Sequence, residues 1–208
     1  MRIELNNSFT GIIGLRNLCE KAKADRFDAV FVPPMSVSMA GEMLGRNDIT
    51  MVTTAGRDED VLDTKLMGIE SAARAGAEEV IVSLSRHHIF DEKWDLLAKE
   101  IFQIRQMGEI HRVFIWIGCG FAHLDRPSQA TIAGMLGKLG LRARNPSAGD
   151  IQLAKLCGIR DFCVGLHEYG LEPEVQQELY NAGAGQFVLR DKPEQLTTAK
   201  LNRTEVNL

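Results

Sequence analysis

The stretch ITMVTTAGRDEDVLDTKLMGIESAARAGAEEVIVSL, residues 49–84, carries the pattern on which the fold prediction depends. Two runs rich in Val, Ile and Thr enclose a segment in which Leu62, Leu66 and Ile69 recur at helical spacing. Gly76 lies between that segment and the second run, where a helix commonly ends in a left-handed glycine. The stretch therefore predicts a strand, a helix and a second strand of a parallel sheet.

The same alternation extends through most of the chain. Strands are predicted at residues 2–5, 29–33, 49–54, 80–84, 113–117, 141–145, 162–166 and 186–189. Eight strands that alternate with helices favour an α/β fold closed into a (β/α)8 TIM barrel, with a single domain over residues 1–208. A doubly wound open sheet is the alternative, although no G-x-G-x-x-G turn follows the first strand.

Capping residues indicate where one long helix begins and ends. Asp91 is placed to cap a helix that contains Trp94 and Leu97. Gly108 follows this helical stretch just before a strand, where a left-handed cap favours glycine. We therefore expect the helix to start after Asp91 and to stop near Gly108.

Composition excludes several classes of protein. The 208 residues are 45% hydrophobic and 25% charged, with a net charge of −4, which is typical of a soluble globular chain. This balance favours neither a nucleic-acid nor a membrane partner, and the first residues lack the features of a secretory signal. We expect a cytoplasmic protein whose cysteines form no disulfides, namely Cys19, Cys119, Cys157 and Cys163.

The motifs LCEKAK at 18–23, DAVFVPP at 28–34, MVTTAG at 51–56 and AGAEEV at 75–80 together resemble deoxyribose-phosphate aldolase. With weaker similarity the match continues to Arg190 and covers most of the chain. The resemblance implies a class I aldolase barrel and a small anionic or phosphorylated metabolite as partner. It also implies a homodimer or higher oligomer, because the family commonly dimerises.

The catalytic residues that the resemblance would supply are replaced in this chain. The family forms a Schiff base on a strand lysine in a KTSTG-like motif, and Asn145 takes the place of that lysine. His167 replaces a second lysine, and Ile81 replaces an aspartate. An amide cannot form an imine, and neither can Arg144 if the match slips by one residue. The chain thus resembles a diverged aldolase that lacks the Schiff-base lysine.

No lysine falls within a predicted strand. The nine lysines are Lys21, Lys23, Lys65, Lys93, Lys99, Lys138, Lys155, Lys192 and Lys200. A Schiff-base lysine must be desolvated or lie beside another cation to be neutral near pH 7. We expect all nine on solvated helix faces or connections, which provide neither environment.

The remaining candidates for catalysis lie near the predicted C-terminal mouth of the barrel, where barrel enzymes have their active sites. His167 and Glu168 form the best pair, because a histidine can transfer a proton and a carboxylate can tune it. Asn145 is a third candidate, because it takes the place of the family's Schiff-base lysine at the same mouth. Glu4 falls where the family carries an aspartate on its first strand. We predict these four residues as catalytic.

Ligand binding is predicted for a second set of residues at the same mouth. Gly170 and Arg190 stand in the place of the family's phosphate-binding turns. The guanidinium of Arg190 is a fork suited to phosphate or carboxylate. Ser83 and Ser147 complete the predicted substrate-binding set.

The loop histidines His87, His88 and His123, together with His167, have the residue type that could surround a metal. Metal ligands need rigid, convergent placement, whereas a histidine pair in a loop is more often solvated surface. We therefore expect neither a metal nor another cofactor.

Two functions are compatible with these residues. In the first, the protein is a lyase-family homologue that acts on or binds a small anionic or phosphorylated aldehyde or sugar without an imine. In the second, it is a catalytically inactive aldolase homologue that serves as a ligand-binding, regulatory or assembly subunit. A fold alone does not decide between them.

Overall fold

The computed structural model describes residues 2–6, 11–119, 124–139, 142–144, 162–166, 181 and 184–189. Eight parallel strands close into a barrel in chain order, with β8 pairing to β1. The strands are β1 (Arg2–Leu5), β2 (Ala29–Phe31), β3 (Thr50–Thr54), β4 (Glu79–Ser83), β5 (Phe114–Gly118), β6 (Arg142–Arg144), β7 (Phe162–Leu166) and β8 (Ala184–Leu189). The predicted TIM barrel is confirmed, and the open-sheet alternative is wrong.

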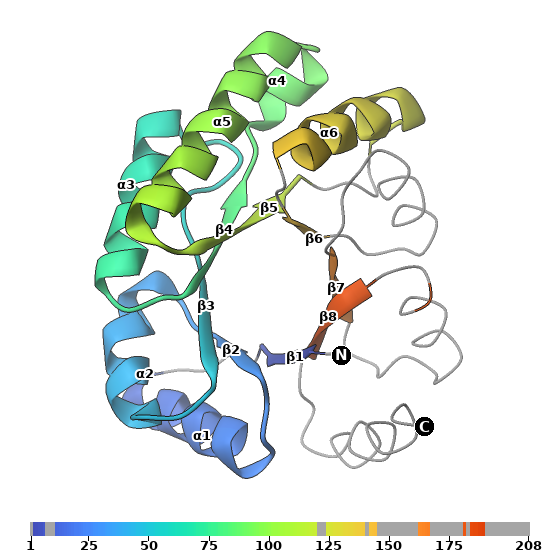
Figure 1. The fold of residues 1–208 in the computed structure, drawn as a ribbon. Helices are drawn as coiled ribbons and strands as arrows, with labels where there is room; N and C mark the ends of the chain where they lie inside the picture. Colours follow the sequence, from blue (N-terminus) through green and yellow to red (C-terminus); the bar gives the residue numbers. More distant parts are fainter. Residues whose placement is uncertain are drawn as a thin grey trace.

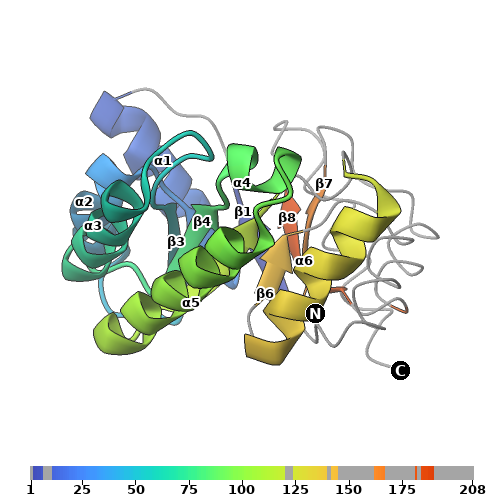
Figure 2. The same ribbon diagram turned by 90° about the horizontal axis from the view of Figure 1, so that it is seen from above.

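Helices surround the ring of strands. Figure 1 looks into the barrel, and Figure 2 shows the helices from above. They are α1 (Gly11–Ala24), the 3-10 helix η1 (Pro34–Ser36), α2 (Val37–Leu44), α3 (Leu62–Arg74), α4 (Arg86–Phe90), α5 (Trp94–His111) and α6 (Arg126–Leu139). In the described part of the chain, no helix combines the length and the apolar character needed to cross a membrane.

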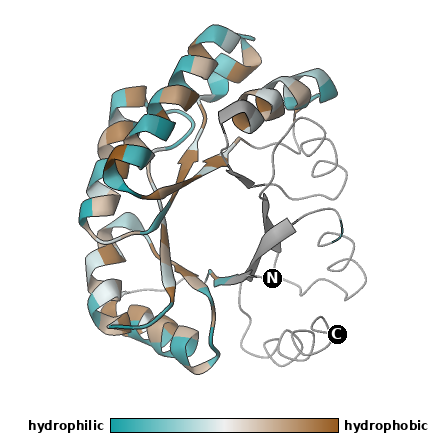
Figure 3. Ribbon diagram, in the orientation of Figure 1, coloured by the Kyte–Doolittle hydropathy of each residue, from teal (hydrophilic) through white to brown (hydrophobic). Residues whose placement is uncertain are grey.

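The strands of the described barrel bury side chains on both faces. Val30, Val80 and Val82 belong to the core that lies between the strands and the helices. Ala29 on β2 and Ile81 on β4, each one position away, belong to a second, smaller cluster with Trp116 on β5. Because successive strand side chains point to opposite faces, this second cluster fills the barrel interior. Figure 3 shows the resulting apolar character of β4 and β5 beside helices of mixed character.

Two helix boundaries differ from the sequence prediction. Asp91 does not cap α5, because it ends α4 and accepts a 2.7 Å hydrogen bond from Lys93 Nζ. Gly108 does not end α5 either, since the left-handed residue is Arg112 with φ +56°. The role of Gly108 is packing, because a Cβ added there would lie 2.5 Å from Ile115 Cγ1. Gly76 follows α3 with φ +100°, as predicted.

Candidate functional site

A cavity of about 440 Å³ opens at the C-terminal ends of β4 and β5. Side chains from both strand ends, from α4 and from the neighbouring loops form its wall. They are Asp58, Ser83, Leu84, Arg86, Ile89, Phe90, Gly118, Cys119 and Leu124. The volume is within the range of small-molecule sites, roughly 300–1,000 Å³.

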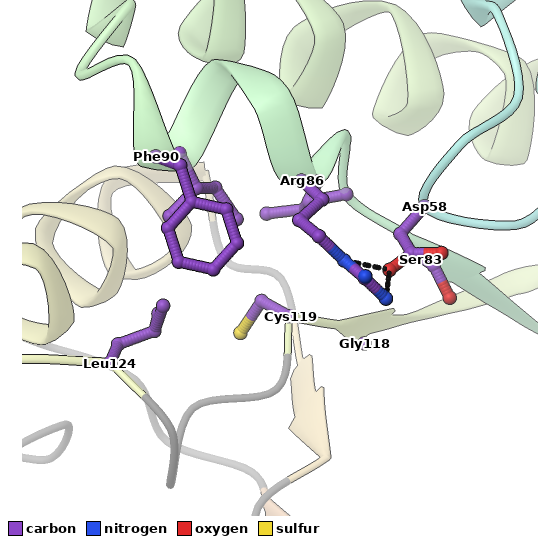
Figure 4. A pocket seen from close by; sticks show the side chains of 9 residues that line it. Asp58, Ser83, Arg86, Phe90, Gly118, Cys119 and Leu124 are labelled. Carbon is purple, nitrogen blue, oxygen red and sulfur yellow. Dashed lines mark hydrogen bonds and ion pairs between the residues drawn. The ribbon is translucent and has the colours of Figure 1, made fainter.

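The two sides of the cavity differ in chemistry. Phe90, Leu124 and the sulfur of Cys119 lie on one side, and Arg86 and Asp58 lie on the other (Figure 4). An apolar wall that faces a few polar groups can bind a ligand with a carbon body and a charged end. The described residues thus place a small amphipathic site at the mouth of the barrel.

Arg86 and Asp58 join the loops that follow β4 and β3. Arg86 donates from Nε to Asp58 Oδ2 at 2.7 Å and pairs with the same oxygen through Nη2 at 2.5 Å. The backbone N–H of Arg86 donates to the Asp58 carbonyl at 3.1 Å. The Arg86 side chain remains more than half exposed. Its guanidinium has further N–H donors beyond those that engage Asp58, so it can also contact an anion.

Ser83 is the predicted substrate-binding residue that the structure places in this cavity. It ends β4, and its register partner on β5 is Gly118. The absence of a side chain at Gly118 keeps the space opposite Ser83 open, since a Cβ there would lie 3.6 Å from Ser83 Oγ. The hydroxyl of Ser83 is therefore available at the cavity wall, and its binding role stays a prediction.

Glu4 lies elsewhere. It is fully buried on β1, with Ala29 and Val188 as register partners. Leu5 packs into the core under the helices, so the alternation of the strand directs Glu4 toward the barrel interior. Glu4 is not among the residues that line the cavity. Its catalytic role stays a prediction.

The other predicted site residues lie outside the described residues. They are the catalytic candidates Asn145, His167 and Glu168 and the binding candidates Ser147, Gly170 and Arg190. Of the loop histidines, His87 and His88 are in α4, with ring centroids 4.1 Å apart. Within the described ranges, no group of three His, Cys, Asp or Glu side chains is arranged to hold a metal ion.

The barrel interior near β4 and β5 is apolar at the position that the family resemblance assigns to an aspartate. Ile81 belongs to the interior cluster and is almost fully buried. Trp116 lies beside it in register and donates from Nε1 to Glu79 Oε2 at 2.8 Å. Ile81 supplies no proton donor or acceptor, so no proton transfer can take place through its side chain.

Lys65 contradicts the expectation that every lysine is solvated. Its side chain is 0% exposed within α3, and its ammonium donates to Glu100 Oε1 at 2.7 Å and to Ser85 Oγ at 2.9 Å. It lies in a helix and not in a strand, as predicted. An ammonium held by a carboxylate has no lone pair to attack a carbonyl. None of the eight described strands contains a lysine.

The Glu100 carboxylate also accepts hydrogen bonds from residues other than Lys65. The backbone N–H of Ser85 donates to both carboxylate oxygens, at 3.2 and 3.4 Å, and Ser85 Oγ donates to Oε1 at 2.9 Å. His88 Nδ1 lies 3.2 Å from Oε2. Ser85 is the residue between Leu84 and Arg86, which both line the cavity. This charged cluster therefore lies directly behind the cavity wall.

Comparison with known proteins supports the resemblance to deoxyribose-phosphate aldolases. The chain is 26% identical over 94 residues to deoxyribose-phosphate aldolase 1 of Vibrio vulnificus strain YJ016, which covers 44% of this chain and 43% of that protein. It is also 26% identical over 99 residues to deoxyribose-phosphate aldolase of Caldanaerobacter subterraneus subsp. tengcongensis, covering 47% and 43%. The similarity thus spans less than half the length of these relatives. No protein-family model matches the chain.

Solved structures share the fold over nearly the whole chain. The deoxyribose phosphate aldolase of Aeropyrum pernix, described as a unique tetramer, aligns with a TM-score of 0.75 at 15% identity and covers 99% of this chain and 90% of that one. The aldolase QR15 aligns with a TM-score of 0.80 at 14% identity, covering 98% and 96%. At these identities the likeness establishes the barrel fold alone.

Proposed function

We propose that this protein is a diverged deoxyribose-phosphate-aldolase-like barrel that binds or acts on a small anionic or phosphorylated aldehyde or sugar without an imine. The proposal is carried by the absence of lysine from the eight described strands, since the imine chemistry of the family needs a strand lysine. Ile81 in place of the family's aspartate supports it further. Lys65 is buried but is engaged by Glu100.

The cavity at β4 and β5 is proposed as part of the ligand site. Arg86 and Ser83 would contact an anionic or hydroxyl group of the ligand, and Phe90 and Leu124 would cover its carbon body. Such a division of apolar walls and a few polar groups fixes the orientation of a small ligand. The size of the cavity fits a molecule of the sugar-phosphate class better than a polymer.

The proposed chemistry is proton transfer at the mouth. Cleavage of a β-hydroxy carbonyl compound removes the hydroxyl proton and turns the hydroxyl into a carbonyl as the bond between the α and β carbons breaks. The electron pair of that bond forms the enolate of the substrate's own carbonyl group, and the removed proton is returned to the α carbon. Without an imine, the enolate oxygen needs hydrogen-bond donors or a cation. In this proposal His167 takes the hydroxyl proton with Glu168 beside it, and Asn145 and Arg190 donate to the substrate.

The imine-free proposal has a direct chemical test. The protein is incubated with 2-deoxyribose 5-phosphate and sodium borohydride, and its intact mass is measured. We expect an unchanged mass, because no lysine amine condenses with the aldehyde. A stable adduct on any lysine contradicts the proposal, and an active family aldolase treated in parallel serves as the positive control.

Ligand binding is tested by thermal shift with a panel of sugar phosphates and small carboxylic acids. We expect at least one compound to raise the midpoint of unfolding of the protein. The shift should disappear in Arg190→Ala or His167→Ala if the mouth binds the ligand, and in Arg86→Met if the β4–β5 cavity takes part. The alternative, a barrel without a reaction, is favoured if a ligand binds and is recovered unchanged. Failure of the whole panel to bind counts against the metabolite-binding proposal.

The second candidate function is a catalytically inactive ligand-binding, regulatory or assembly subunit. It is favoured by the interior cluster at β4 and β5, where the side chains of Ile81 and Trp116 occupy space that a reactive centre would need. We also propose that the protein is cytoplasmic. We further propose that it self-associates, because a structural neighbour is a tetramer. Light scattering after size-exclusion chromatography tests self-association, and a monomeric mass contradicts it.

A further inference from the structure

We propose that the buried Lys65–Glu100 ion pair is a positioning device for the β4–β5 cavity. The pair would hold the loops that follow β3 and β4 in the arrangement that forms the cavity wall. This inference rests on the proposed function only in taking the cavity as the ligand site. Neither residue touches the cavity, so both act through other residues.

The first link runs from Glu100 to the loop after β4. Ser85 is 3% exposed, and its N–H and hydroxyl both donate to the Glu100 carboxylate. The Ser85 carbonyl accepts the N–H groups of His88 at 3.1 Å and Ile89 at 3.3 Å, which starts α4. One carboxylate on α5 thereby holds the residue that precedes α4.

The consequence for the cavity follows from the position of Ser85 in the chain. Ser83 and Leu84 precede it, and Arg86 follows it, and all three line the cavity. Phe90, at the end of the same short helix, forms the apolar wall. A displacement of Ser85 would move both the polar and the apolar side of the cavity.

The second link runs from the Lys65 side chain to the loop after β3. Gly56 has φ +75° and lies so close to Lys65 that a Cβ added there would be 2.5 Å from Lys65 Cγ. The methylene groups of Lys65 thus support this loop, and the ammonium reaches the next one. Asp58, two residues after Gly56, meets Arg86 across the gap between the loops. The two loops are therefore joined behind the cavity by Lys65 and at the cavity by Asp58.

The chemistry of the pair distinguishes positioning from plain stability. Buried ion pairs can be replaced by apolar residues of similar volume with little loss of stability. Apolar residues cannot accept the Ser85 N–H, which would then lack its acceptor in the buried wall. A variant that folds well and still loses the cavity geometry is therefore the signature of a positioning role.

The test compares two double variants. Lys65→Met/Glu100→Leu removes the charges and the acceptor, whereas Lys65→Met/Glu100→Gln removes the charges and keeps an amide oxygen for Ser85. The readout is the rate at which iodoacetamide alkylates Cys119, followed by peptide mass spectrometry. Cys119 lines the cavity and is 8% exposed, so its rate reports opening of the wall.

We expect Lys65→Met/Glu100→Leu to speed alkylation of Cys119 by about tenfold or more, as local opening becomes more frequent. Lys65→Met/Glu100→Gln should stay near the wild-type rate. Cys19 is the internal control, because it is buried in α1, where burial raises the pKa of its thiol. Its alkylation should not change unless the whole protein opens. Equal Cys119 rates in the wild type and both double variants overturn the inference.

Two further measurements keep the outcome decisive. If Lys65→Met/Glu100→Leu does not fold, Ser85→Ala replaces it. This variant removes the hydroxyl that donates to Glu100 and leaves Lys65 and Glu100 paired. An unchanged alkylation rate of Cys119 in Ser85→Ala then overturns the inference. The exposed pair Arg105 and Glu109, 2.7 Å apart on α5, is the matched control and should leave Cys119 unaffected when removed. A Cys119 rate that rises in this control as much as in the buried variant also contradicts the positioning role.

Calorimetric binding of 2-deoxyribose 5-phosphate separates this inference from the proposed function. If the wild type binds it, affinity should fall in Lys65→Met/Glu100→Leu and recover in Lys65→Met/Glu100→Gln; equal affinity in all three counts against positioning. If the wild type does not bind it, the proposed function loses support. The alkylation result then still decides whether the pair positions the wall.

Discussion

Lys65 Nζ lies 2.7 Å from Glu100 Oε1, and both side chains are buried. The pair joins α3 to α5, two helices that pack against each other beside β4 and β5. A charge buried without its partner is far more unfavourable than the same charge in water. The energetic role of the two residues therefore depends on whether they are removed singly or together.

Removal of one partner should destabilise the protein strongly. We expect Glu100→Leu or Lys65→Met alone to lower the free energy of unfolding by about 3–5 kcal/mol. The double variant Lys65→Met/Glu100→Leu should lose much less than the sum, because no charge remains buried. Urea denaturation followed by circular dichroism measures all three.

The surface pair Arg105–Glu109 provides the reference for this prediction. Its side chains are substantially exposed, so Glu109→Gln should change the free energy of unfolding by about 0–1 kcal/mol. If Glu100→Leu costs no more than Glu109→Gln, the buried pair does not contribute as its geometry indicates.

Gly108 should be required for the packing of α5 on β5. A Cβ at this position would lie 2.5 Å from Ile115 Cγ1 and 3.1 Å from the Val113 carbonyl oxygen. Gly108→Ala should therefore destabilise the protein by about 1–3 kcal/mol, despite the higher helix propensity of alanine. Thermal and urea unfolding of the purified variant measure the change.

Gly134 is the matched control, since it is also inside a helix and a Cβ there meets nothing within 4 Å. Gly134→Ala should stabilise the protein by up to about 1 kcal/mol through helix propensity alone. If Gly108→Ala and Gly134→Ala change the free energy of unfolding in the same direction, contact with Ile115 does not determine the effect at position 108.

The barrel was predictable because its local patterns agree with one another. Apolar runs such as 80–84 have no polar alternation, which is expected for parallel strands buried on both faces. Their predicted limits differ from those of β4 by one residue at each end. The capping prediction at Asp91 failed because a short extra helix, α4, precedes α5 and uses Asp91 at its own end.

Apolar periodicity does not reveal the charged cluster, because it defines the buried face of a helix by its apolar residues alone. Lys65 lies four residues before Ile69 and seven before Ala72, so it shares the buried face of α3. Glu100 lies in the same way between Leu97 and Ile104 on α5. Opposite charges on two buried faces were a readable signal for an internal ion pair.

The cavity was only partly predictable from sequence. Ser83 was predicted because it lies near the end of a predicted strand, and the C-terminal ends of barrel strands meet at one mouth. Phe90 and Leu124 are separated by more than thirty residues and come together only when β4 and β5 pair. No periodicity in one segment could indicate that contact.

Trp116 should contribute to stability through its hydrogen bond as well as its size. Its indole Nε1 donates to the buried Glu79 carboxylate at 2.8 Å. Trp116→Phe removes this donor and reduces the filled volume of the barrel interior. We expect a loss of about 2–4 kcal/mol in the free energy of unfolding, measured by urea titration. Trp94→Phe, at the half-buried start of α5, should cost clearly less, and equal losses would contradict the assigned role of Glu79.

The contribution of Asp125 to the free energy of unfolding should depend on pH. Its Oδ1 accepts the backbone N–H of Ser128 at 2.9 Å at the start of α6. Hydrogen bonds from the side chain and backbone of Ser128 lower the pKa of Asp125 below the usual value. Because the folded pKa is the lower one, the stabilisation is fully present above the unfolded pKa of about 3.9 and is lost as pH falls through the folded pKa.

Asp125→Ala should therefore lower the thermal midpoint at pH 7, and the difference from the wild type should shrink as pH falls below about 4. Asp125→Asn keeps an oxygen that can accept the N–H but does not titrate, so its midpoint should exceed that of Asp125→Ala by an amount nearly independent of pH. Thermal melts of the three proteins between pH 7 and pH 3 measure both trends. A constant difference between Asp125→Ala and the wild type over this range would mean that the carboxylate charge does not stabilise the start of α6.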